Sequence, residues 1–261
     1  MALNEKQIER YSRHIILEQF GAAGQEKLLS SKVLIVGTGG LGSPAALYLA
    51  AAGVGTVGIA DADSVELSNL QRQIIHSTDD IGSKKTASAE KKIRALNPDV
   101  IVRSYNTRLR AGNISEIIRE YDFIMDCTDN FSSKFLINDA CYFEKKAFSH
   151  AGVLKFEGQL ITILPGKTAC YRCIFSSPPP ADAVPSCSQA GVLGVLAGVV
   201  GVLQATEAIK YVLSIGDLLT DTLLTYNALT MNFRRVHIAR NRQCALCGDN
   251  PTITELKDDS Q

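Results

Sequence analysis

The sequence predicts an α/β protein with a doubly wound, mainly parallel sheet that continues into a region of antiparallel strands. Short β-branched runs alternate with helical patterns as far as Val153, the order expected for a parallel sheet with helices on both faces. A glycine-rich turn, Gly37 to Gly42, joins the first of these runs directly to a helical pattern. After Val153 the remaining β-type runs have the composition of strands that pair antiparallel.

These patterns divide the chain into four segments. Residues 1–30 form a helical N-terminal segment, and residues 31–153 form a Rossmann-like half. Residues 154–250 hold the antiparallel strands, and residues 251–261 are a loose polar tail. Because 261 residues with 46% hydrophobic side chains can bury a substantial core, we expect one compact domain.

Hydrophobic periodicity and chain breakers place the individual elements. The N-terminal segment is predicted to be a polar-capped amphipathic helix over Asn4–Phe20, with an extension over Gln25–Leu29. The other predicted helices are Pro44–Ala52, Lys84–Leu96, Ile114–Glu120, Ser132–Lys145 and Gly191–Ser214. The predicted strands are Lys32–Val36, Gly55–Asp61, Val100–Tyr105, Phe123–Cys127, Gly158–Leu164, Thr222–Asn227 and Asn232–Ile238. A proline-rich stretch, Ser176–Ser186, is expected to be an exposed, mobile loop.

Charge and hydropathy argue against two classes of partner. The 27 basic and 27 acidic residues balance, so the net charge favours neither nucleic acid nor a membrane surface. The longest apolar run, Gly191–Leu203, falls short of the roughly 20 residues that a membrane span needs. The polar N-terminus lacks the apolar core of a signal peptide. We therefore expect a cytoplasmic protein.

Four of the seven cysteines form two C-x-x-C pairs, Cys170/Cys173 and Cys244/Cys247. Two such pairs supply the four soft thiolates of a tetrahedral structural zinc site. That site would be closed, so the zinc would fix the second half of the chain and take no part in chemistry. The alternatives are a dithiol redox motif or unligated thiols. The four histidines show no ligand spacing, and we assign them no role.

The glycine turn has the pattern of a nucleotide-binding loop, with Gly37, Gly39 and Gly42 in G-x-G-x-x-G spacing. Such a loop lets phosphate approach the backbone and the N–H groups at the helix start. Asp61, at the end of the next strand, is placed to accept hydrogen bonds from ribose hydroxyls. This pattern fits NAD, FAD, S-adenosylmethionine or ATP, and also a plain glycine turn with a capping aspartate. The chain lacks the G-K-[ST] ending of a P-loop.

Charged residues beyond the ends of the predicted strands favour a triphosphate. Arg72 and Lys85 follow the second strand, and Asp129 follows the strand that ends near Cys127. Basic side chains neutralise phosphate oxygens, and a carboxylate holds magnesium on a leaving pyrophosphate. A nicotinamide site does not need this set. Taken singly, Arg72 and Lys85 are equally consistent with solvated surface charges.

Motifs along nearly the whole chain resemble the ThiF/MoeB/HesA family, the bacterial relatives of ubiquitin-activating enzymes. The motifs occur in a fixed order, which makes chance a poor explanation. They are Arg10-Tyr11-Ser12-Arg13, the loop Gly37 to Gly42, Ser68-Asn69-Leu70-Gln71-Arg72-Gln73, Cys127-Thr128-Asp129-Asn130, Cys170-Tyr171-Arg172-Cys173, Ala190-Gly191-Val192 and the pair Cys244 to Cys247.

This resemblance implies an ATP- and magnesium-dependent adenylyltransferase. Family members activate the C-terminal Gly-Gly carboxylate of a ubiquitin-fold sulfur carrier protein as an acyl-adenylate and release pyrophosphate. The carrier would be ThiS-like or MoaD-like, and the pathway thiamine or molybdopterin synthesis. Residues 154–250 would bind the carrier, a separate protein would donate the sulfur, and the enzyme would be a homodimer.

The resemblance also assigns roles to individual residues. Asp61 would hold the ribose, Arg72 and Lys85 would clamp the phosphates, and Asp129 would ligate magnesium with Asn130 beside it. Arg13 would reach the triphosphate of the neighbouring subunit, although by itself it reads as an exposed helix charge. The remaining residues of the predicted nucleotide site are Gly37, Gly39, Gly40, Gly42, Asp63, Ser68 and Asn69.

Cys187 lies just before the long helix that follows the proline-rich loop. A helix N-terminus lowers the pKa of a thiol, and in the family this position resembles a cysteine that bonds covalently to the activated carrier. A bland packed or surface thiol is the alternative. Cys127 and Cys141 are expected to be core residues.

Two other functions remain open on the sequence alone. The loop and Asp61 by themselves also suit an NAD-dependent oxidoreductase, and relatives with the same ATP motifs adenylate other carboxylates, including a peptide. A carrier-binding scaffold without catalysis is disfavoured because Arg72, Lys85 and Asp129 are all present.

Overall fold

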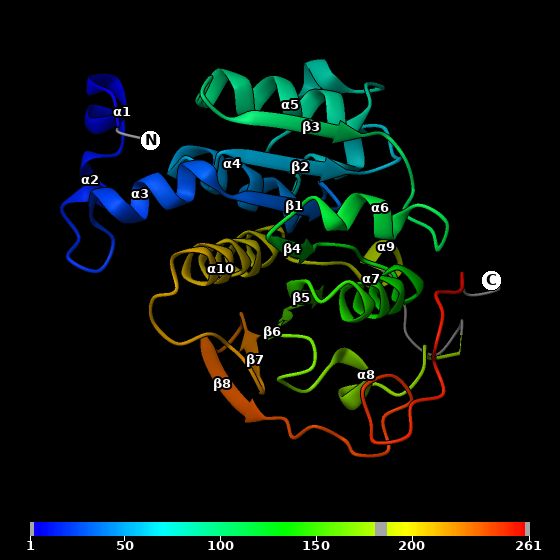
Figure 1. Cartoon of the computed structure of the whole chain (residues 1–261). Helices are drawn as coiled ribbons and strands as arrows, with labels where there is room; N and C mark the ends of the chain where they lie inside the picture. The colour runs from blue at the N-terminus through cyan, green and yellow to red at the C-terminus, as the bar shows by residue number, and fades with distance from the viewer. Residues whose placement is uncertain (1–2, 181–186, 259–261) are drawn as a thin grey trace.

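Eight strands form one mixed sheet in the order β3-β2-β1-β4-β5-β6-β7-β8 (Figure 1). The computed structural model describes residues 3–180 and 187–258, except the side chains of Cys187 and Ser188. The strands are β1 (Lys32–Val36), β2 (Thr56–Ala60), β3 (Ile101–Tyr105), β4 (Phe123–Asp126), β5 (Ala147–Leu154), β6 (Glu157–Ile163), β7 (Thr222–Asn227) and β8 (Asn232–His237). The first five pair in parallel and the last three pair antiparallel, which confirms the predicted change along the chain.

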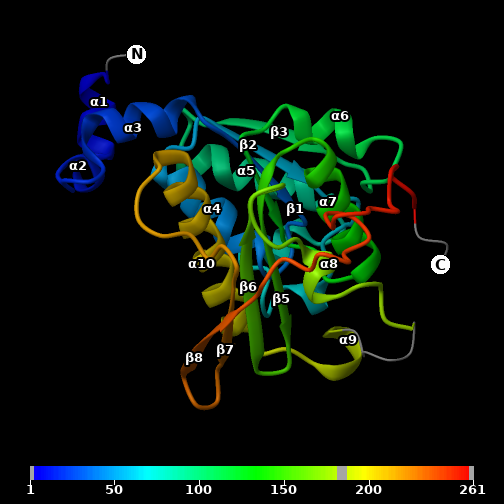
Figure 2. The same ribbon diagram turned by 60° about the horizontal axis from the view of Figure 1, so that its bottom comes forward.

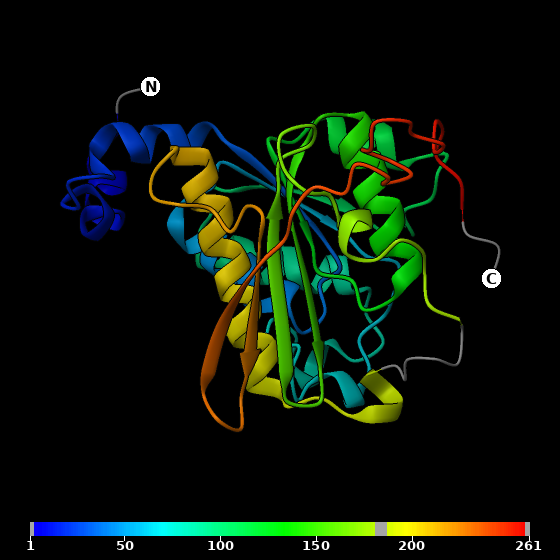
Figure 3. The same cartoon turned by 90° about the horizontal axis from the view of Figure 1, so that it is seen from below.

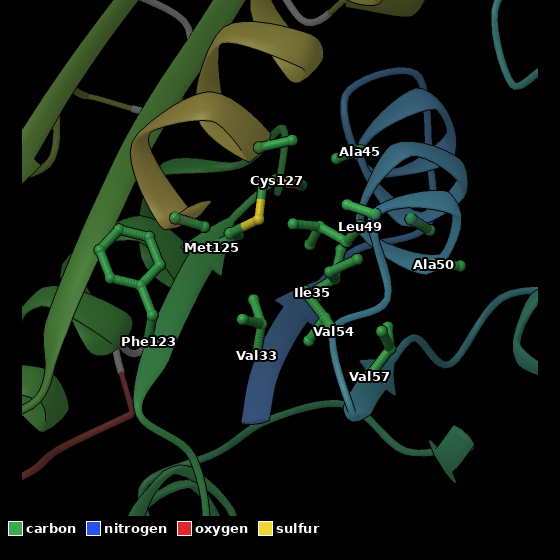
Figure 4. Packing of buried hydrophobic residues seen from close by; sticks show 14 of the residues in the cluster. Val33, Ile35, Ala45, Leu49, Ala50, Val54, Val57, Phe123, Met125 and Cys127 are labelled. Atoms are coloured by element: carbon green, nitrogen blue, oxygen red, sulfur yellow. The ribbon is translucent and has the colours of Figure 1, made fainter. Parts of the chain in front are cut away.

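Helices cover both faces of the parallel part of the sheet. Alternate residues of β1 point to opposite faces: Val33 and Ile35 pack under α4 and α10, whereas Leu34 packs with α6 and α7. Figure 4 shows Val33 and Ile35 between β4 and the helix that carries Leu49. The helices are α1 (Glu5–Arg10), α2 (Ser12–Ile15), α3 (Gly21–Ser30), α4 (Gly42–Ala52), α5 (Lys85–Leu96), α6 (Ile114–Arg119), α7 (Phe131–Phe143), α8 (Tyr171–Ile174), α9 (Cys187–Ala190) and α10 (Gly194–Leu213), with 3-10 turns η1 (Leu67–Asn69) and η2 (Thr78–Asp80).

The carboxyl ends of the central parallel strands lie in register. Val36 of β1 pairs with Ala60 of β2 and with Asp126 of β4, and Ala60 pairs with Tyr105 of β3. The loops that follow these strands therefore meet at one edge of the sheet. In open α/β sheets this edge is where ligands bind.

The N-terminal segment differs from the single long helix predicted for it. Asn4 does cap α1, but the helix ends at Arg10, because the next residue, Tyr11, has φ and ψ of −101° and 12°, which are not helical. The Tyr11 side chain is buried, and its hydroxyl accepts a 2.9 Å hydrogen bond from Asn97 Nδ2. Because the Tyr11 ring is held in this position, the helix is interrupted there, and α1, α2 and α3 are separate. Figure 1 shows α1 and α2 at one corner of the molecule.

Strand β5 has no counterpart among the predicted strands. It holds Ser149, His150 and Gly152, so its sequence lacks a continuous β-branched run. The strand is instead stabilised by pairing with its neighbours, since β5 is parallel to β4 and antiparallel to β6. It is the strand at which the sheet changes from parallel to antiparallel.

Within the predicted polar tail, the described residues 251–258 make contacts with the rest of the chain. Ile253 and Leu256 are partly buried against the hydrophobic cluster on the α7 face. The backbone N–H groups of Thr252 and Ile253 both donate to the carbonyl of Ala245, at 2.8 and 2.9 Å. The segment runs near α7 in Figure 2.

Helix α10 is long and apolar enough to span a membrane by length and composition. Half of its most apolar window is buried inside the protein, and the helix packs along β5 and β6 (Figure 3). Gln204 and Glu207, both buried, hydrogen-bond to the sheet from its inner face. This is the pattern of a core helix, as predicted.

Candidate active site

A cavity of about 810 Å³ opens at the carboxyl edge of the parallel strands and extends to β5, β6 and β7. It therefore joins the two halves of the chain. Most of the predicted nucleotide-site residues line it, namely Gly37, Gly39, Gly40, Asp61, Asp63, Arg72, Lys85, Asp129 and Asn130.

Close packing explains two of the loop glycines. Gly37 has a φ of +93°, and a Cβ atom there would lie 2.9 Å from the carbonyl oxygen of Cys127. A Cβ on Gly42 would overlap the carbonyl oxygen of Gly37. The turn thus stays tight, and α4 begins at Gly42 beside the cavity. A helix N-terminus of this kind favours anions, so the start of α4 suits a phosphate on this side of the cavity.

Asp61 ties the end of β2 to the glycine loop. Its Oδ2 accepts hydrogen bonds from the backbone N–H and the hydroxyl of Thr38, at 2.8 and 3.0 Å. Its Oδ1 accepts from the backbone N–H of Asp63 at 2.9 Å. The carboxylate lines the cavity in a fixed orientation, which a hydrogen-bonding partner of ribose requires.

Two basic side chains face the same cavity from beyond β2. Lys85 begins α5; its side chain is only 8% exposed, and its ammonium lies 2.9 Å from Asp63 Oδ2. Arg72 Nη1 donates to the carbonyl of Ser68 at 3.2 Å. Both have a partner on one side and the cavity on the other, so both can bind an anion there.

Ser68, Asn69 and Gly42 lie near the cavity without lining it. Asn69 is buried, and its Oδ1 accepts from the backbone N–H of Glu66, which closes η1. In this structure Asn69 shapes the turn that carries Arg72. Gly42 acts through the packing of the loop.

Arg13 does not line the cavity, and the side chain of Cys187 lies outside the described residues. Arg13 is exposed on α2, at the corner formed by the N-terminal helices. Cys187 begins α9, but its side chain lies outside the described residues. Gln189, on the same short helix, does line the cavity.

Asp129 and Asn130 sit at the junction of β4 and α7. Asn130 caps α7, and its Oδ1 accepts from the backbone N–H of Ser133 at 2.9 Å. Asp129 is exposed and lines the cavity, and no hydrogen bond or ion pair joins its carboxylate to the rest of the described chain. An oxygen ligand available in this way fits a magnesium ion, which binds through one or two carboxylates together with substrate phosphates.

A buried polar network beneath Asp129 was missed by the sequence reasoning. Asp126 Oδ1 accepts from the Thr128 hydroxyl at 2.6 Å, and Asp126 Oδ2 lies 2.7 Å from His150 Nδ1. The Lys134 ammonium donates to the carbonyl of Ala151 at 2.7 Å and lies 3.5 Å from Asp126 Oδ2. The only sequence signal was a lysine four residues after Asn130, because His150 belongs to the unpredicted strand β5.

The pKa values in this network favour an ionised Asp126 and a neutral His150. Burial alone would raise the pKa of Asp126, but Lys134 and hydrogen bonds from His150 and Thr128 outweigh it and hold that pKa at about 2. Burial and the neighbouring Lys134 lower the pKa of His150 to about 4. At neutral pH Asp126 therefore balances Lys134, and His150 is uncharged.

The far end of the cavity belongs to the antiparallel part of the sheet. It is lined by Gly152 of β5, Gln159 of β6 and Thr225 of β7. These residues are neighbours in register, since Gly152 pairs with Gln159 and Gln159 pairs with Thr225. Apart from Glu157 of β6, the lining residues of this end are uncharged, in contrast to the nucleotide end, where several charged side chains line the cavity.

The four paired cysteines converge into one cluster. The Sγ distances are 3.9 Å between Cys170 and Cys173, 3.6 Å between Cys170 and Cys244, and 3.4 Å between Cys173 and Cys247. All four sulfur atoms lie within 4.8 Å of one another. Thiolates bound to a tetrahedral zinc at about 2.3 Å are about 3.8 Å apart, so the cluster fits that ion. The backbone N–H of Asn241 donates to Cys173 Sγ at 3.3 Å, a contact that stabilises thiolate.

The sheet, the glycine loop and the mixed-charge cavity together define a doubly wound α/β protein with a candidate nucleotide site. The chain belongs to the ThiF family, whose family model matches residues 11–246. The resemblance seen in the motifs is thereby confirmed.

Three relatives that match nearly the full length of this chain agree with this family assignment. The chain is 46% identical to the sulfur carrier protein adenylyltransferase of Thermus thermophilus, over 99% of this chain and 97% of that protein. It is 47% identical to the SAMP-activating enzyme E1 of Haloferax volcanii, over 95% and 92%. It is 45% identical to the adenylyltransferase and sulfurtransferase MOCS3 of Sus scrofa, over 98% of this chain and 57% of that protein. The chain is an enzyme of the adenylyltransferase class.

Solved structures agree with the fold. Escherichia coli MccB with MccA-N7isoASN superposes with a TM-score of 0.81 at 22% identity, over 94% of this chain and 76% of that one. MccB with ATP gives a TM-score of 0.77 at 24% identity, over 94% and 75%. At this identity the likeness describes the architecture alone.

Proposed function

We propose that this enzyme uses ATP to adenylate the C-terminal carboxylate of a ubiquitin-fold sulfur carrier protein. The observation that carries the proposal is the extent of the cavity, which joins an end with several charged side chains at the glycine loop to a largely uncharged end at β5, β6 and β7. A nucleotide fits the first end and an extended chain terminus the second. Both would then meet near Asp129 and Gly152.

In the proposed reaction a carboxylate oxygen of the carrier attacks the α-phosphorus of ATP. The bond from that phosphorus to pyrophosphate breaks, and the products are acyl-adenylate and pyrophosphate. Because negative charge develops on the phosphate oxygens, Arg72 and Lys85 would stabilise the transition state. Asp61 would hold the ribose, which keeps the reacting atoms in line. Asp129 would bind magnesium, which neutralises charge on the leaving pyrophosphate.

We propose zinc as the ion of the four-cysteine cluster. The site is closed, so its role would be to fix the segment after Cys244 against the body of the enzyme. Reduced thiols in this number also support a cytoplasmic location.

Arg13 is proposed to act in the cavity of a second copy of the chain. It does not line its own cavity, and next to it along the chain are the exposed apolar side chains of Ile16 and Leu17, 72% and 52% exposed. A cation beside exposed apolar surface fits burial against another subunit.

Cys187 is proposed to take the acyl group from the adenylate as a thioester, with AMP as the leaving group. What supports this is the short helix α9, which carries Cys187 at its start and Gln189 at the cavity wall. A covalent adduct with the carrier, seen by mass spectrometry and absent in Cys187→Ala, tests this role separately from adenylation.

The test of the main proposal is ATP–pyrophosphate exchange with magnesium and purified carriers. A ThiS-like carrier and a MoaD-like carrier, each ending in Gly-Gly, are compared with a synthetic peptide of the same C-terminal sequence. Exchange with one carrier would support the proposal and select thiamine or molybdopterin synthesis as the pathway. Exchange with the peptide alone would point to another carboxylate substrate, and tight NAD binding without exchange to an oxidoreductase.

Asp129→Ala is the matched negative control for exchange. It should lower the rate by about 100-fold or more, the usual effect of losing one electrostatic stabiliser of a transition state. Asp79→Ala removes an exposed carboxylate that does not line the cavity, and it should leave the rate unchanged. Equal rates in both variants would remove Asp129 from the mechanism.

A further inference from the structure

The loop between β3 and α6 forms a wall of the cavity that the family motifs do not include. Thr107, Arg108 and Leu109 line the cavity there. Arg108 and Leu109 also line an adjoining pocket of about 230 Å³, shared with Ser133 and Leu136 of α7. Leu109 is 8% exposed, so the wall has a buried apolar residue next to Arg108 along the chain.

Arg108 differs from the other basic side chains of the cavity. Lys85 is paired with Asp63, Lys134 with Asp126, and Arg72 donates to the carbonyl of Ser68. The guanidinium of Arg108 is exposed and makes no hydrogen bond or ion pair with the described part of the chain. Its donors and its planar face are both available to a ligand in the cavity.

The order of the strands indicates which part of a bound nucleotide would lie near Arg108. The glycine loop follows β1, Asp61 follows β2, and the loop with Arg108 follows β3, in the sheet order β3-β2-β1. Neighbouring strands lie about 4.8 Å apart, which places the end of β3 roughly 10 Å from the end of β1. Phosphates on the glycine loop and a ribose at Asp61 therefore direct the base toward Arg108 and Leu109.

A carboxylate of the C-terminal segment holds this loop. Asp258 Oδ1 accepts a 2.9 Å hydrogen bond from the backbone N–H of Ala111, and Asp258 lines the smaller pocket beside Arg108. Leu256, two residues earlier, packs on the same hydrophobic cluster as Leu109. The segment thus fixes the position of the loop from outside the cavity.

We propose that Arg108 is a nucleotide-binding residue that contacts the purine base through its guanidinium face, and that Asp258 is a positioning residue for its loop. A guanidinium over an aromatic ring, with the apolar Leu109 in the same wall, is a favourable arrangement for a base. The inference rests on the proposed function, because it takes the cavity ligand to be ATP.

The experiment measures dissociation constants of the full chain, without carrier, for ATP, AMP and inorganic tripolyphosphate by calorimetry. Arg108→Ala should raise the constants for ATP and AMP by similar factors, about 5- to 30-fold, and leave tripolyphosphate binding unchanged. Arg72→Ala is the matched control, since it should weaken tripolyphosphate and ATP but affect AMP less. Arg108 is exposed, so the substitution should not alter the thermal midpoint.

The positioning role of Asp258 is tested by comparing a disruptive substitution with a conservative one. Asp258→Ala should raise the constants for ATP and AMP about 2- to 5-fold, while Asp258→Asn, which keeps a hydrogen-bond acceptor for Ala111, should restore wild-type values. Hydrogen exchange at the Ala111 amide should follow the same order.

Three outcomes would overturn the proposal. An Arg108→Ala variant that loses tripolyphosphate affinity as strongly as ATP affinity would make Arg108 a phosphate ligand. A variant that binds all three ligands like the wild type would make it a surface charge, with the proposed adenylation untouched. A wild-type enzyme that binds neither ATP nor AMP would overturn this inference together with the proposed function.

Discussion

Asp126, at the carboxyl end of β4, faces His150 in the middle of β5, with 2.7 Å between Asp126 Oδ2 and His150 Nδ1. Both side chains are almost fully buried, at 0% and 1% exposure. The other oxygen of Asp126 binds the backbone N–H and hydroxyl of Thr128, the residue before Asp129. The pair therefore holds the turn that presents Asp129 to the cavity.

The charge balance between Asp126 and Lys134 gives a first prediction. Asp126→Asn or Lys134→Met alone leaves one buried charge unpaired, and each should lower the free energy of unfolding by about 3–5 kcal/mol. The double variant removes both charges, so it should be less destabilised than the sum of the two single variants by more than about 1 kcal/mol. Urea unfolding of the four proteins measures this. Additive effects would show that the two side chains do not interact.

The pH dependence of stability gives a second prediction. His150 has a pKa of about 4 in the folded protein, below its value of about 6.5 in an unfolded chain. As the pH falls from 6.5 to 4 the unfolded chain binds a proton that the folded protein does not. The free energy of unfolding should therefore fall through this window, with His150 contributing roughly 3 kcal/mol.

His150→Asn isolates that contribution, since an asparagine amide can donate to Asp126 without titrating. The variant should lose less stability than the wild type between pH 6.5 and 4.5. Burial also lowers the pKa of His76, but that residue is the same in both proteins. Urea titrations at several pH values test the difference, and parallel curves would argue against a buried neutral His150.

Much of the fold was predictable because strand and helix periods are local properties. The run Lys32–Val36 and the glycine turn after it are visible in the sequence, and β1 and α4 follow them closely. Strand β5 was not predictable, because its residues are held by pairing to β4 and β6 across long sequence separations. The break at Tyr11 has the same cause, a contact with Asn97.

In the candidate site, too, features set by local sequence were predictable and features set by long-range contacts were not. Arg72, Lys85 and Asp129 were found because charged residues beyond strand ends are conspicuous, and all three line the cavity. Lys134 and His150 were missed because a buried network is formed by three different elements. Arg108 was missed because one exposed arginine in a loop carries no signal until the sheet order places it beside Asp61.

The four-cysteine cluster gives a third prediction. Cys244→Ser should abolish binding of about one zinc per chain, while Cys141→Ala, at a buried cysteine outside the cluster, should retain it. Because Thr252 and Ile253 donate to Ala245 inside this segment, their amides should exchange faster with solvent when the metal is removed by a chelator. Mass spectrometry of the intact protein and hydrogen exchange measure both effects. Unchanged exchange at Thr252 would mean that the fold of the segment does not depend on metal.

The last prediction concerns Arg13 and can separate action within a subunit from action between subunits. Arg13→Ala and Asp129→Ala should each lower the rate of ATP–pyrophosphate exchange by about 100-fold or more. If Arg13 serves the neighbouring cavity, each mixed dimer of the two variants has one site with both residues intact. Random pairing makes half of the dimers mixed, so the mixture should recover about one quarter of wild-type activity. If Arg13 serves its own cavity, no site in a mixed dimer is intact and the mixture stays inactive. Lys6→Ala, at an exposed lysine of α1, should leave exchange unchanged and controls for general effects on the N-terminal helices.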